Sequence, residues 1–308
     1  MRNIFADKIY ELSKKNNKIH VVVADISPAG SIEKFRRKYP KRFINVGVSE
    51  QVMAGISAGL ALSGKKPFIY TIAAFVLYRP FEMIRDDICY QNLPVTIVGM
   101  GSGTIYSTLG CTHMTQEDIS IARSVPNMQI ISPCDPFELK EAIKFCSEKS
   151  KRPTYLRIGK SGEKNYSKKN SEKFEFGKIR NIIKGKKICF LVHGVLIKKV
   201  FEACEILNKQ NINPSVYSCH TLKPFDNKRI KKIFSKYKLI VTLEDHSIIG
   251  GLSEIVNGLA FKNKYKYKII NFSLKDSFID SYGSHDDILN KHGISTNKIL
   301  KKLKAKIE

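Results

Sequence analysis

The chain has 308 residues, of which 43% are hydrophobic and 26% are charged, and its formal net charge is +25. This length predicts about two domains, each able to bury its own core. No apolar run reaches the roughly 18–20 residues that span a bilayer, so we expect no membrane partner. The first 18 residues are typical of a polar amphipathic helix without the apolar segment of a signal peptide, which favours a cytoplasmic protein.

In the first half of the chain, short β-branched runs alternate with segments of helical periodicity. We expect strands at residues 19–25, 43–48, 67–72, 95–99 and 128–132, and helices at residues 51–63, 79–91, 119–124 and 136–148. Strands that alternate with helices predict an α/β fold with a doubly wound, mostly parallel sheet. Residues 161–175 are polar and lack periodicity, which indicates a linker.

The α/β pattern resumes after this linker. Strands are expected at residues 188–192, 214–217, 239–243 and 268–272, and helices at residues 196–210 and 253–259. We therefore expect two α/β domains, with the first over residues 1–165, a linker at 166–177 and a smaller second domain over 178–308.

The positive charge is unevenly distributed along the chain. Residues 1–160 hold 23 basic and 14 acidic side chains, whereas residues 161–308 hold 30 and 14. Nucleic-acid binding is one interpretation of the Lys-rich runs in the second half. No helix-turn-helix, zinc-finger or RNA-binding signature accompanies these runs, so a solvated surface without a nucleic-acid partner is favoured.

The seven cysteines are scattered and form no CxxC pair. Most of them lie inside apolar segments, as is usual for thiols that pack in a core. The pattern indicates reduced core thiols and neither a disulfide framework nor a metal site in this chain.

Ligands bind parallel α/β sheets beyond the carboxyl ends of the strands, where loops meet helix N-termini. Glu50 lies at such a junction, in the first turn of the helix that follows the strand at 43–48, with Ser49 as the expected N-cap. Its carboxylate either binds a ligand or only stabilises the positive end of the helix. Position alone favours the second alternative.

Two aromatic residues and one histidine occupy comparable places. Phe75 and Tyr78 follow the strand at 67–72 and can stack on a flat heterocycle, although rings at this spacing more often belong to a core. His113 lies in a Gly- and Thr-rich loop, where it is either a substrate or acid–base ligand or a hydrogen-bonded structural residue.

Taken together, these segments resemble the transketolase family. The segments that carry the resemblance follow the family order from about residue 20 onward: VADISPAG, FINVGVSEQVMAGISAGLALSG, IYTIAAFVLYRPFEMIRDD, STLGCTHMTQEDI, RSVPNMQIISPCDP, RPTYLRIGK and LEDHSIIGGLSE. They imply a thiamine pyrimidine-binding domain followed by a transketolase C-terminal domain. The sequence holds no Gly-Asp-Gly, the motif with which the family binds Mg²⁺ and the cofactor diphosphate. The resemblance therefore implies an N-terminal partner subunit that supplies that half of the site.

The resemblance implies thiamine diphosphate as the cofactor and gives roles to the matching residues. Glu50 matches the glutamate that shares a proton with N1′ of the aminopyrimidine and so activates the cofactor. Phe75 matches the ring that stacks on the pyrimidine, and Tyr78 a neighbouring aromatic residue of that pocket. Asp25 matches an acidic position near the thiazolium.

On the substrate side, His113 matches a catalytic histidine that contacts the oxygen atoms of the sugar. Lys160 falls where the family has a phosphate-binding arginine, within a pattern that begins at Arg157. Two positions depart from classical transketolases, which have an aspartate in place of Leu109 and a histidine in place of Gly101. The departures imply a sugar or sugar phosphate other than the ordinary pentose-phosphate pair.

The activity that the resemblance implies is transfer of a two-carbon ketol unit from a ketose to an aldehyde, within an α2β2 assembly. A more distant resemblance leaves open the β subunit of a 2-oxo-acid dehydrogenase. A basic nucleic-acid-binding scaffold is the non-enzymatic alternative.

Overall fold

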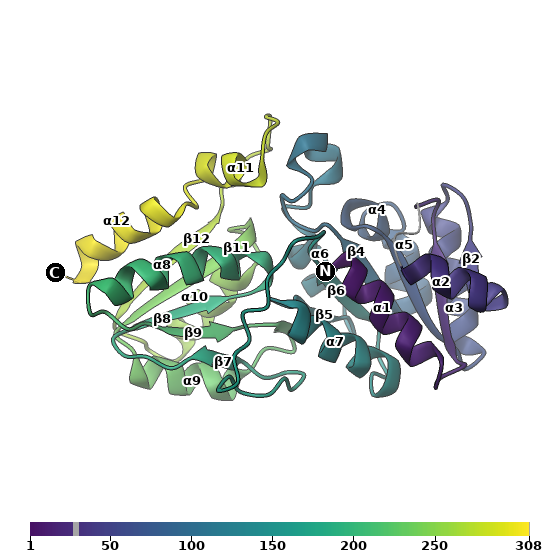
Figure 1. The fold of residues 1–308 in the computed structure, drawn as a ribbon, viewed down its shortest axis with the longest axis horizontal. Helices are drawn as coiled ribbons and strands as arrows, with labels where there is room; N and C mark the ends of the chain where they lie inside the picture. The colour runs from purple at the N-terminus through teal and green to yellow at the C-terminus, as the bar shows by residue number, and fades with distance from the viewer. Residues whose placement is uncertain (27–30, 308) are drawn as a thin grey trace.

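A computed structural model describes residues 1–26 and 31–307 of the chain. Two α/β domains lie side by side, the N-terminal one on the right of Figure 1 and the C-terminal one on the left. The described strands form a seven-stranded, mostly parallel sheet and a second sheet of five strands. The expected fold class, two α/β domains with a doubly wound first sheet, is confirmed.

The first sheet has the strand order β10-β5-β6-β4-β3-β1-β2, and all of its pairs are parallel except β10 with β5. Its strands are β1 (Ile19–Val23), β2 (Phe43–Asn45), β3 (Lys66–Ile72), β4 (Thr96–Met100), β5 (Gln129–Ile131), β6 (Thr154–Ile158) and β10 (Thr221–Lys223). The helices of this domain are α1 (Arg2–Ser13), α2 (Ser31–Lys38), α3 (Glu50–Leu62), α4 (Ala73–Leu77), α5 (Phe81–Met83), α6 (Asp118–Ser124) and α7 (Pro136–Glu148). Shorter helical turns are η1 (Pro40–Arg42), η2 (Ile84–Tyr90), η3 (Ser107–Leu109) and η4 (Cys111–His113).

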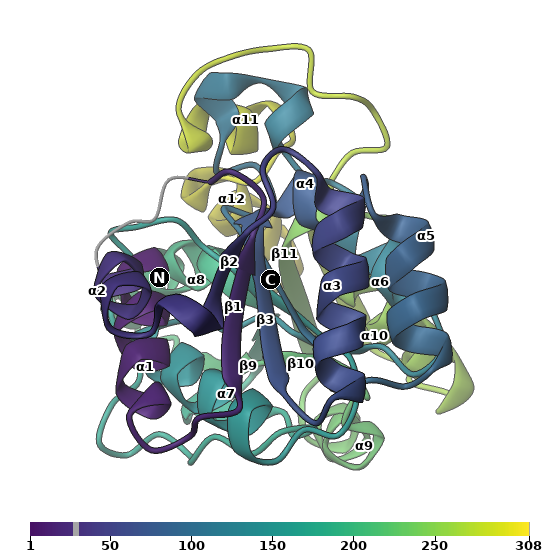
Figure 2. The ribbon, with the colours of Figure 1, turned by 90° about the vertical axis from the view of Figure 1, so that its right-hand side faces the viewer.

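Helices cover both faces of the first sheet, and every side chain of β1, β4 and β6 is therefore buried. Val21 and Val23 belong to a core shared with α1 and α7, whereas Val22, between them, belongs to the core shared with α3 and η2. Figure 2 shows α1 and α2 on one side of the sheet and α3 and α5 on the other.

The second sheet has the order β12-β11-β8-β9-β7, parallel except for the pair of β7 with β9. Its strands are β7 (Arg180–Ile183), β8 (Ile188–Val192), β9 (Ser215–Ser218), β11 (Leu239–Ser247) and β12 (Lys268–Leu274). The helices are η5 (Gly194–Leu196), α8 (Ile197–Lys209), α9 (Asn227–Lys236), α10 (Leu252–Lys262), α11 (His285–Lys291) and α12 (Thr296–Ile307).

The strand β10 joins the two domains in an unexpected way. It lies in the second half of the sequence, yet it pairs antiparallel with β5 of the first sheet, Thr221 opposite Ile131. The backbone N–H of Ser132 also donates to the carbonyl of His220, just before β10. The first sheet is therefore completed by the second half of the chain.

Two expected elements differ from those observed. The strand expected at 43–48 ends at Asn45, because the side chain of Asn45 accepts hydrogen bonds from the N–H groups of Asp25 and Gly47 and turns the backbone away. The helix expected at 79–91 is a short α-helical turn, α5, followed by the wider π-helical turn η2, which buries Ile84 and Ile88.

Candidate active site

Glu50 begins α3 directly after a turn in which Gly47 has φ +72°. Ser49 is the N-cap, as expected, but its side chain makes no capping hydrogen bond. Glu50 is 4% exposed, and its Oε1 accepts a hydrogen bond of 2.6 Å from Nη1 of Arg79. The start of α3 and the guanidinium of Arg79 thus together fix the position of this buried carboxylate.

A continuous row of side chains leads away from Glu50. The Arg79 guanidinium lies 3.9 Å from the ring centroid of Phe75, and the Phe75 and His113 rings are 5.1 Å apart in an edge-to-face arrangement. The ring of His113 is 6.4 Å from that of Tyr106, and the ammonium of Lys160 lies 4.6 Å from the Tyr106 centroid. The fold therefore brings Glu50, Phe75, His113 and Lys160 together, although they are far apart in the sequence.

Tyr78 follows α4 and is half-buried. Its hydroxyl is fully buried and has no hydrogen-bond partner among the described residues. Burial, reinforced by the nearby negative charge of Asp118, raises the pKa of this hydroxyl far above its ordinary value, so it remains a neutral donor. A buried donor without a partner carries a free-energy cost that a bound ligand can remove.

Asp25 and Arg157 lie in different surroundings from the row. Asp25 follows β1 with φ 44° and an exposed side chain, and the next residues, 27–30 of the VADISPAG segment, are outside the described residues. The side chain of Arg157 is 3% exposed; its Nε donates to Asp118 at 2.9 Å and its Nη2 to the carbonyl of Asp245 at 2.7 Å. The guanidinium of Arg157 thus links the two domains, whereas Lys160 lies just beyond the end of β6.

The loop that carries Tyr106 and His113 is fixed by the C-terminal domain. The carboxylate of Asp245 accepts hydrogen bonds from the N–H and the hydroxyl of Thr104, at 3.1 and 2.9 Å. Gly103 leaves the space for it, since a Cβ there would lie 2.1 Å from Oδ2 of Asp245. Although burial opposes its ionisation, the nearby ring of His285, whose Nε2 lies 3.3 Å from Oδ2, with smaller contributions from Arg157 and Thr104, holds the pKa of Asp245 at about 2.

Three neighbours of this row were not predicted from the sequence. Arg79 was part of a recognised segment but had no expected partner, and Tyr106 offered no signal beyond its place in a loop. Arg2 lies at the start of α1; its Nε is buried without a partner among the described residues, and its backbone N–H donates to the carbonyl of Lys160 at 3.0 Å. Only the folded chain places Arg2 beside Lys160.

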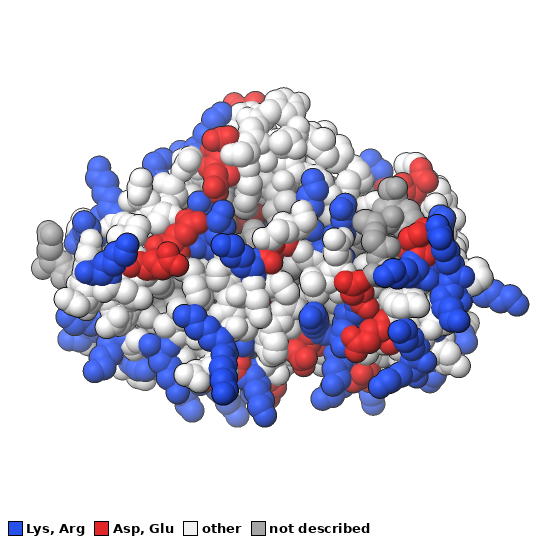
Figure 3. All heavy atoms as spheres, in the orientation of Figure 1, with Lys and Arg blue, Asp and Glu red and all other residues white. Residues whose placement is uncertain are grey.

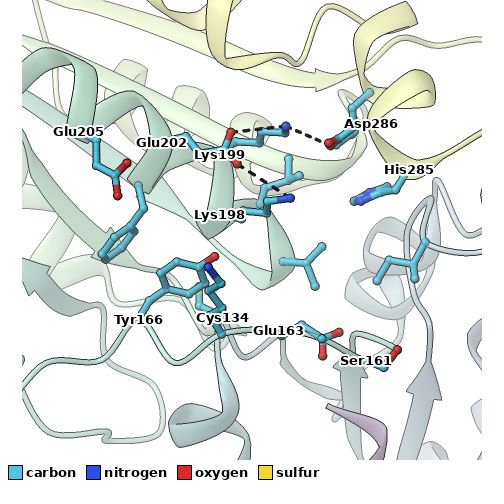
Figure 4. A pocket seen from close by; sticks show the side chains of 17 residues that line it. Cys134, Ser161, Glu163, Tyr166, Lys198, Lys199, Glu202, Glu205, His285 and Asp286 are labelled. Atoms are coloured by element: carbon cyan, nitrogen blue, oxygen red, sulfur yellow. Dashed lines mark ion pairs between the residues drawn. The ribbon is translucent and has the colours of Figure 1, made fainter.

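A cavity of about 600 Å³ is lined by residues of both domains (Figure 4). Its wall includes Ile105 and Ser161, the neighbours of Tyr106 and Lys160, but not Glu50, Phe75 or His113. Its charges are compensated internally: the ammonium of Lys199 lies 3.0 Å from Asp286 and 3.5 Å from Glu202. We therefore keep the row from Glu50 to Lys160, and not this cavity, as the candidate active site.

The surface charge shows no single basic patch on the face drawn in Figure 3. Lys and Arg side chains spread over both domains there, with Asp and Glu among them. Within residues 1–26 and 31–307, no helix is both long and apolar enough to cross a membrane. In the same residues, His, Cys, Asp and Glu side chains form no group of three or more that could hold a metal ion.

Comparison with known proteins decides the family. The model of the transketolase pyrimidine-binding domain matches residues 1–163, and that of the transketolase C-terminal domain matches residues 177–299. A putative transketolase C-terminal section from Methanocaldococcus jannaschii is 34% identical over 304 residues, which cover 98% of this chain and 95% of that protein. The chain belongs to the transketolase family.

Two further relatives of the transketolase family resemble the chain over its whole length. One subunit of an apulose-4-phosphate transketolase from Phocaeicola vulgatus is 30% identical, over 97% of this chain and 95% of that protein. A solved structure of a split-gene transketolase, an inactive β4 tetramer, has a TM-score of 0.86 at 30% identity, and the match covers 99% of this chain and 97% of that one. In this transketolase-family chain, the row from Glu50 to Lys160 lies within the residues matched by the pyrimidine-binding domain.

Proposed function

We propose that this chain is the C-terminal subunit of a thiamine-diphosphate-dependent transketolase that transfers a two-carbon ketol unit from a ketose to an aldehyde acceptor. The observation that carries the proposal is the buried Glu50 at the start of α3, from which Arg79, Phe75, His113, Tyr106 and Lys160 follow one another in a row. Family membership and full-length similarity to transketolase subunits support it.

The residues present fit the aminopyrimidine half of thiamine diphosphate. Phe75 is half-buried and offers a ring for stacking, and Tyr78, three residues later, carries a buried hydroxyl that has no partner among the described residues. No described residue donates to Oε2 of Glu50, so this oxygen is available to hold a proton at N1′ of the pyrimidine. When bound, the cofactor supplies a carbon nucleophile and an electron sink, which no amino-acid side chain provides. We place Asp25 near the thiazolium end, at the same edge of the sheet.

On the substrate side, the proposed reaction breaks the C2–C3 bond of a ketose and releases an aldose. The retained two-carbon unit then forms a new C–C bond with the aldehyde carbon of the acceptor. His113 would donate a hydrogen bond to the oxygen atoms of the sugar and exchange protons there. Lys160 and Arg2 lie together at the far end of the row and would bind a phosphate group. Arg157 is buried between the domains, so we propose that it supports the loop of His113 instead of touching the phosphate.

The proposed partner is an N-terminal subunit that carries Gly-Asp-Gly and binds the diphosphate with Mg²⁺. The similarity to a split-gene transketolase supports a divided enzyme, and two-fold pairing of the pyrimidine-binding domains makes α2β2 the natural assembly. The named relatives give more support to this proposal than to a 2-oxo-acid dehydrogenase β subunit or a nucleic-acid-binding scaffold.

The test is to co-express this chain with the partner subunit and to titrate the complex with thiamine diphosphate and Mg²⁺ by calorimetry, with each subunit alone as the control. We expect tight binding by the complex only, together with consumption of hydroxypyruvate when an aldehyde is present. Failure of the complex to bind the cofactor would overturn the proposal.

A further inference from the structure

Tyr106 occupies the space that a side chain at position 101 would need. Gly101 has φ +68°, and a Cβ built there would lie 2.1 Å from Cε2 of Tyr106. Such a contact is far below any van der Waals distance, and the positive φ disfavours other residues as well. With Tyr106 in this place only glycine fits at position 101, and no polar side chain can reach His113 from there.

The ring of Tyr106 presents carbon atoms to its neighbours in the site. Its hydroxyl donates a hydrogen bond of 3.0 Å to the sulfur of Met100, in the core. At 6% exposure the ring fills space beside His113 and supports the ammonium of Lys160 on its face. The hydroxyl is therefore not directed at a substrate.

Leu109 is held next to Tyr106 by a backbone hydrogen bond, in which its N–H donates to the carbonyl of Tyr106 at 2.8 Å. It ends η3, the turn directly before the turn of His113, and 48% of its surface is exposed. A substrate held by His113 would thus meet leucine methyl groups and the edge of an aromatic ring. A hydroxyl group buried against them would lose its water without gaining a hydrogen bond.

We propose that Tyr106 and Leu109 determine specificity by forming an apolar wall beside His113. The enzyme would prefer a sugar phosphate that lacks a hydroxyl at the carbon facing this wall, with its phosphate at the cationic end formed by Lys160 and Arg2. No described carboxylate forms an ion pair with Lys160, so its ammonium is available to an anion. This inference rests on the proposed function and deepens it.

The test uses the complete complex with thiamine diphosphate and hydroxypyruvate. This donor loses carbon dioxide, and its two-carbon unit is added to the aldehyde carbon of the acceptor. The acceptors are D-ribose 5-phosphate and its 2-deoxy and 3-deoxy analogues. We expect kcat/KM for the better deoxy analogue to exceed that for ribose 5-phosphate by about tenfold to 100-fold. Any ratio above about threefold supports the wall, and a smaller one overturns it.

Variants then test whether the apolar wall, and not the mere addition of a charge to the protein, causes the preference for a deoxy sugar. Leu109→Asp introduces a polar group at an exposed position and should lower the deoxy preference about tenfold or more. Phe261→Asp is the matched control, since it adds the same charge at a residue of α10 that is 89% exposed, and it should leave the ratio and the activity unchanged. Tyr106→Asn should lower the ratio as well; if it fails to fold, Leu109→Asp decides. An unchanged ratio in Leu109→Asp would overturn the proposal.

Binding measurements distinguish this inference from the proposed function. Thiamine diphosphate binding by the complex tests the function, whereas the affinities of the three sugar phosphates, measured by calorimetry without donor, test the wall. A complex that turns over no substrate still gives these affinities. Tighter binding of a deoxy analogue supports the wall, and equal affinities, or binding of none of the three, overturn it.

Discussion

Arg79 holds Glu50 through a hydrogen bond of 2.6 Å while its guanidinium stacks on Phe75. The Glu50 side chain is 5% exposed, whereas the Arg79 side chain is 44% exposed, so the pair joins a buried acid to a base at the surface. One arginine thereby orients both groups to which we assign contact with the aminopyrimidine.

Glu50→Gln should lower turnover of the reconstituted complex at least about 100-fold, because an amide cannot exchange a proton with N1′. Gln keeps the size and polarity of the side chain, so the complex should still bind thiamine diphosphate. The measurements are steady-state kcat and calorimetry. Glu82→Gln, which changes an exposed glutamate of α5, is the control and should be active. Turnover by Glu50→Gln within about twofold of wild type would contradict the assigned role.

The Glu50–Arg79 pair should appear as a coupling energy in a double-mutant cycle. Arg79→Met leaves the buried carboxylate without its counter-charge, and we expect a loss of about 1 kcal/mol in the free energy of unfolding, a modest value because Arg79 is half-exposed. The same substitution in the Glu50→Gln background should cost much less. Urea unfolding of the four proteins measures the cycle, and equal losses in both backgrounds would show that the pair does not contribute to stability.

Asp245→Ala should impair substrate binding without impairing cofactor binding. The change removes the acceptor for the N–H and hydroxyl of Thr104 and loosens the loop that presents Tyr106 and His113. Glu50 and Phe75 lie on other elements and should not move. We expect kcat/KM for the sugar phosphate to fall about tenfold or more, mainly through KM, with unchanged thiamine diphosphate affinity. A parallel loss of cofactor affinity would indicate general unfolding instead.

His220 should make the protein less stable in mild acid. It is buried, stacks 4.3 Å from the ring of Phe174, and its Nε2 has no partner among the described residues. Burial lowers its pKa to about 3, compared with about 6.5 when unfolded. Because the unfolded chain binds the proton more readily, stability falls as the pH falls from about 6.5 toward 3, by about 2 kcal/mol between pH 7 and pH 5.

The measurement for His220 is urea unfolding at several pH values in wild type and in His220→Asn, which does not titrate. The difference in the free energy of unfolding between wild type and His220→Asn should change by about 2 kcal/mol between pH 7 and pH 5. Parallel curves would show that His220 is protonated equally in both states.

The outer face of α3, together with Val48 just before it, should be an assembly surface. Val48, Val52 and Ile56 follow one another at helical spacing and are 71%, 50% and 36% exposed, and Gly55 and Gly59 have open space above them. Exposed apolar stripes of this kind mark protein contacts. We expect Val52→Lys to reduce the assembled mass in light scattering, whereas Tyr90→Lys, at an exposed residue of η2, should not. An unchanged mass in Val52→Lys would remove α3 from the interface.

Local order along the chain predicted that Glu50, Phe75 and His113 lie beyond the carboxyl ends of strands, but their position left ligand binding and a purely structural role both open. Their assigned roles rest on the resemblance to the transketolase family and remain predictions. The partners of these residues were not predictable. Arg79 reaches Glu50 across 29 positions, and Arg157 and Asp245 meet across 88. Such contacts depend on how helices and domains pack, which no local pattern encodes.

The Lys-rich segments of the second half show a similar limit, because their charge alone did not reveal the secondary structure that they form. Their charge suggested only a solvated surface, yet α9 buries Ile230, Ile233 and Phe234 on its inner face. Its lysines cover the outside of an ordinary amphipathic helix. Most of the positive charge of the second half therefore accompanies secondary structure instead of forming a separate binding segment.

The pairing of β10 with β5 limits how the two domains can be exchanged with those of related proteins, in evolution or by engineering. A fragment ending at residue 165 would leave the edge of β5 unpaired, and an open edge invites association with other chains. The two domains are thus poor candidates for exchange by recombination, since a C-terminal domain from a distant relative would have to bring a compatible edge strand. A chimeric gene that preserves the pairing of β10 with β5 has to take the residues from β1 to β10 from a single parent protein.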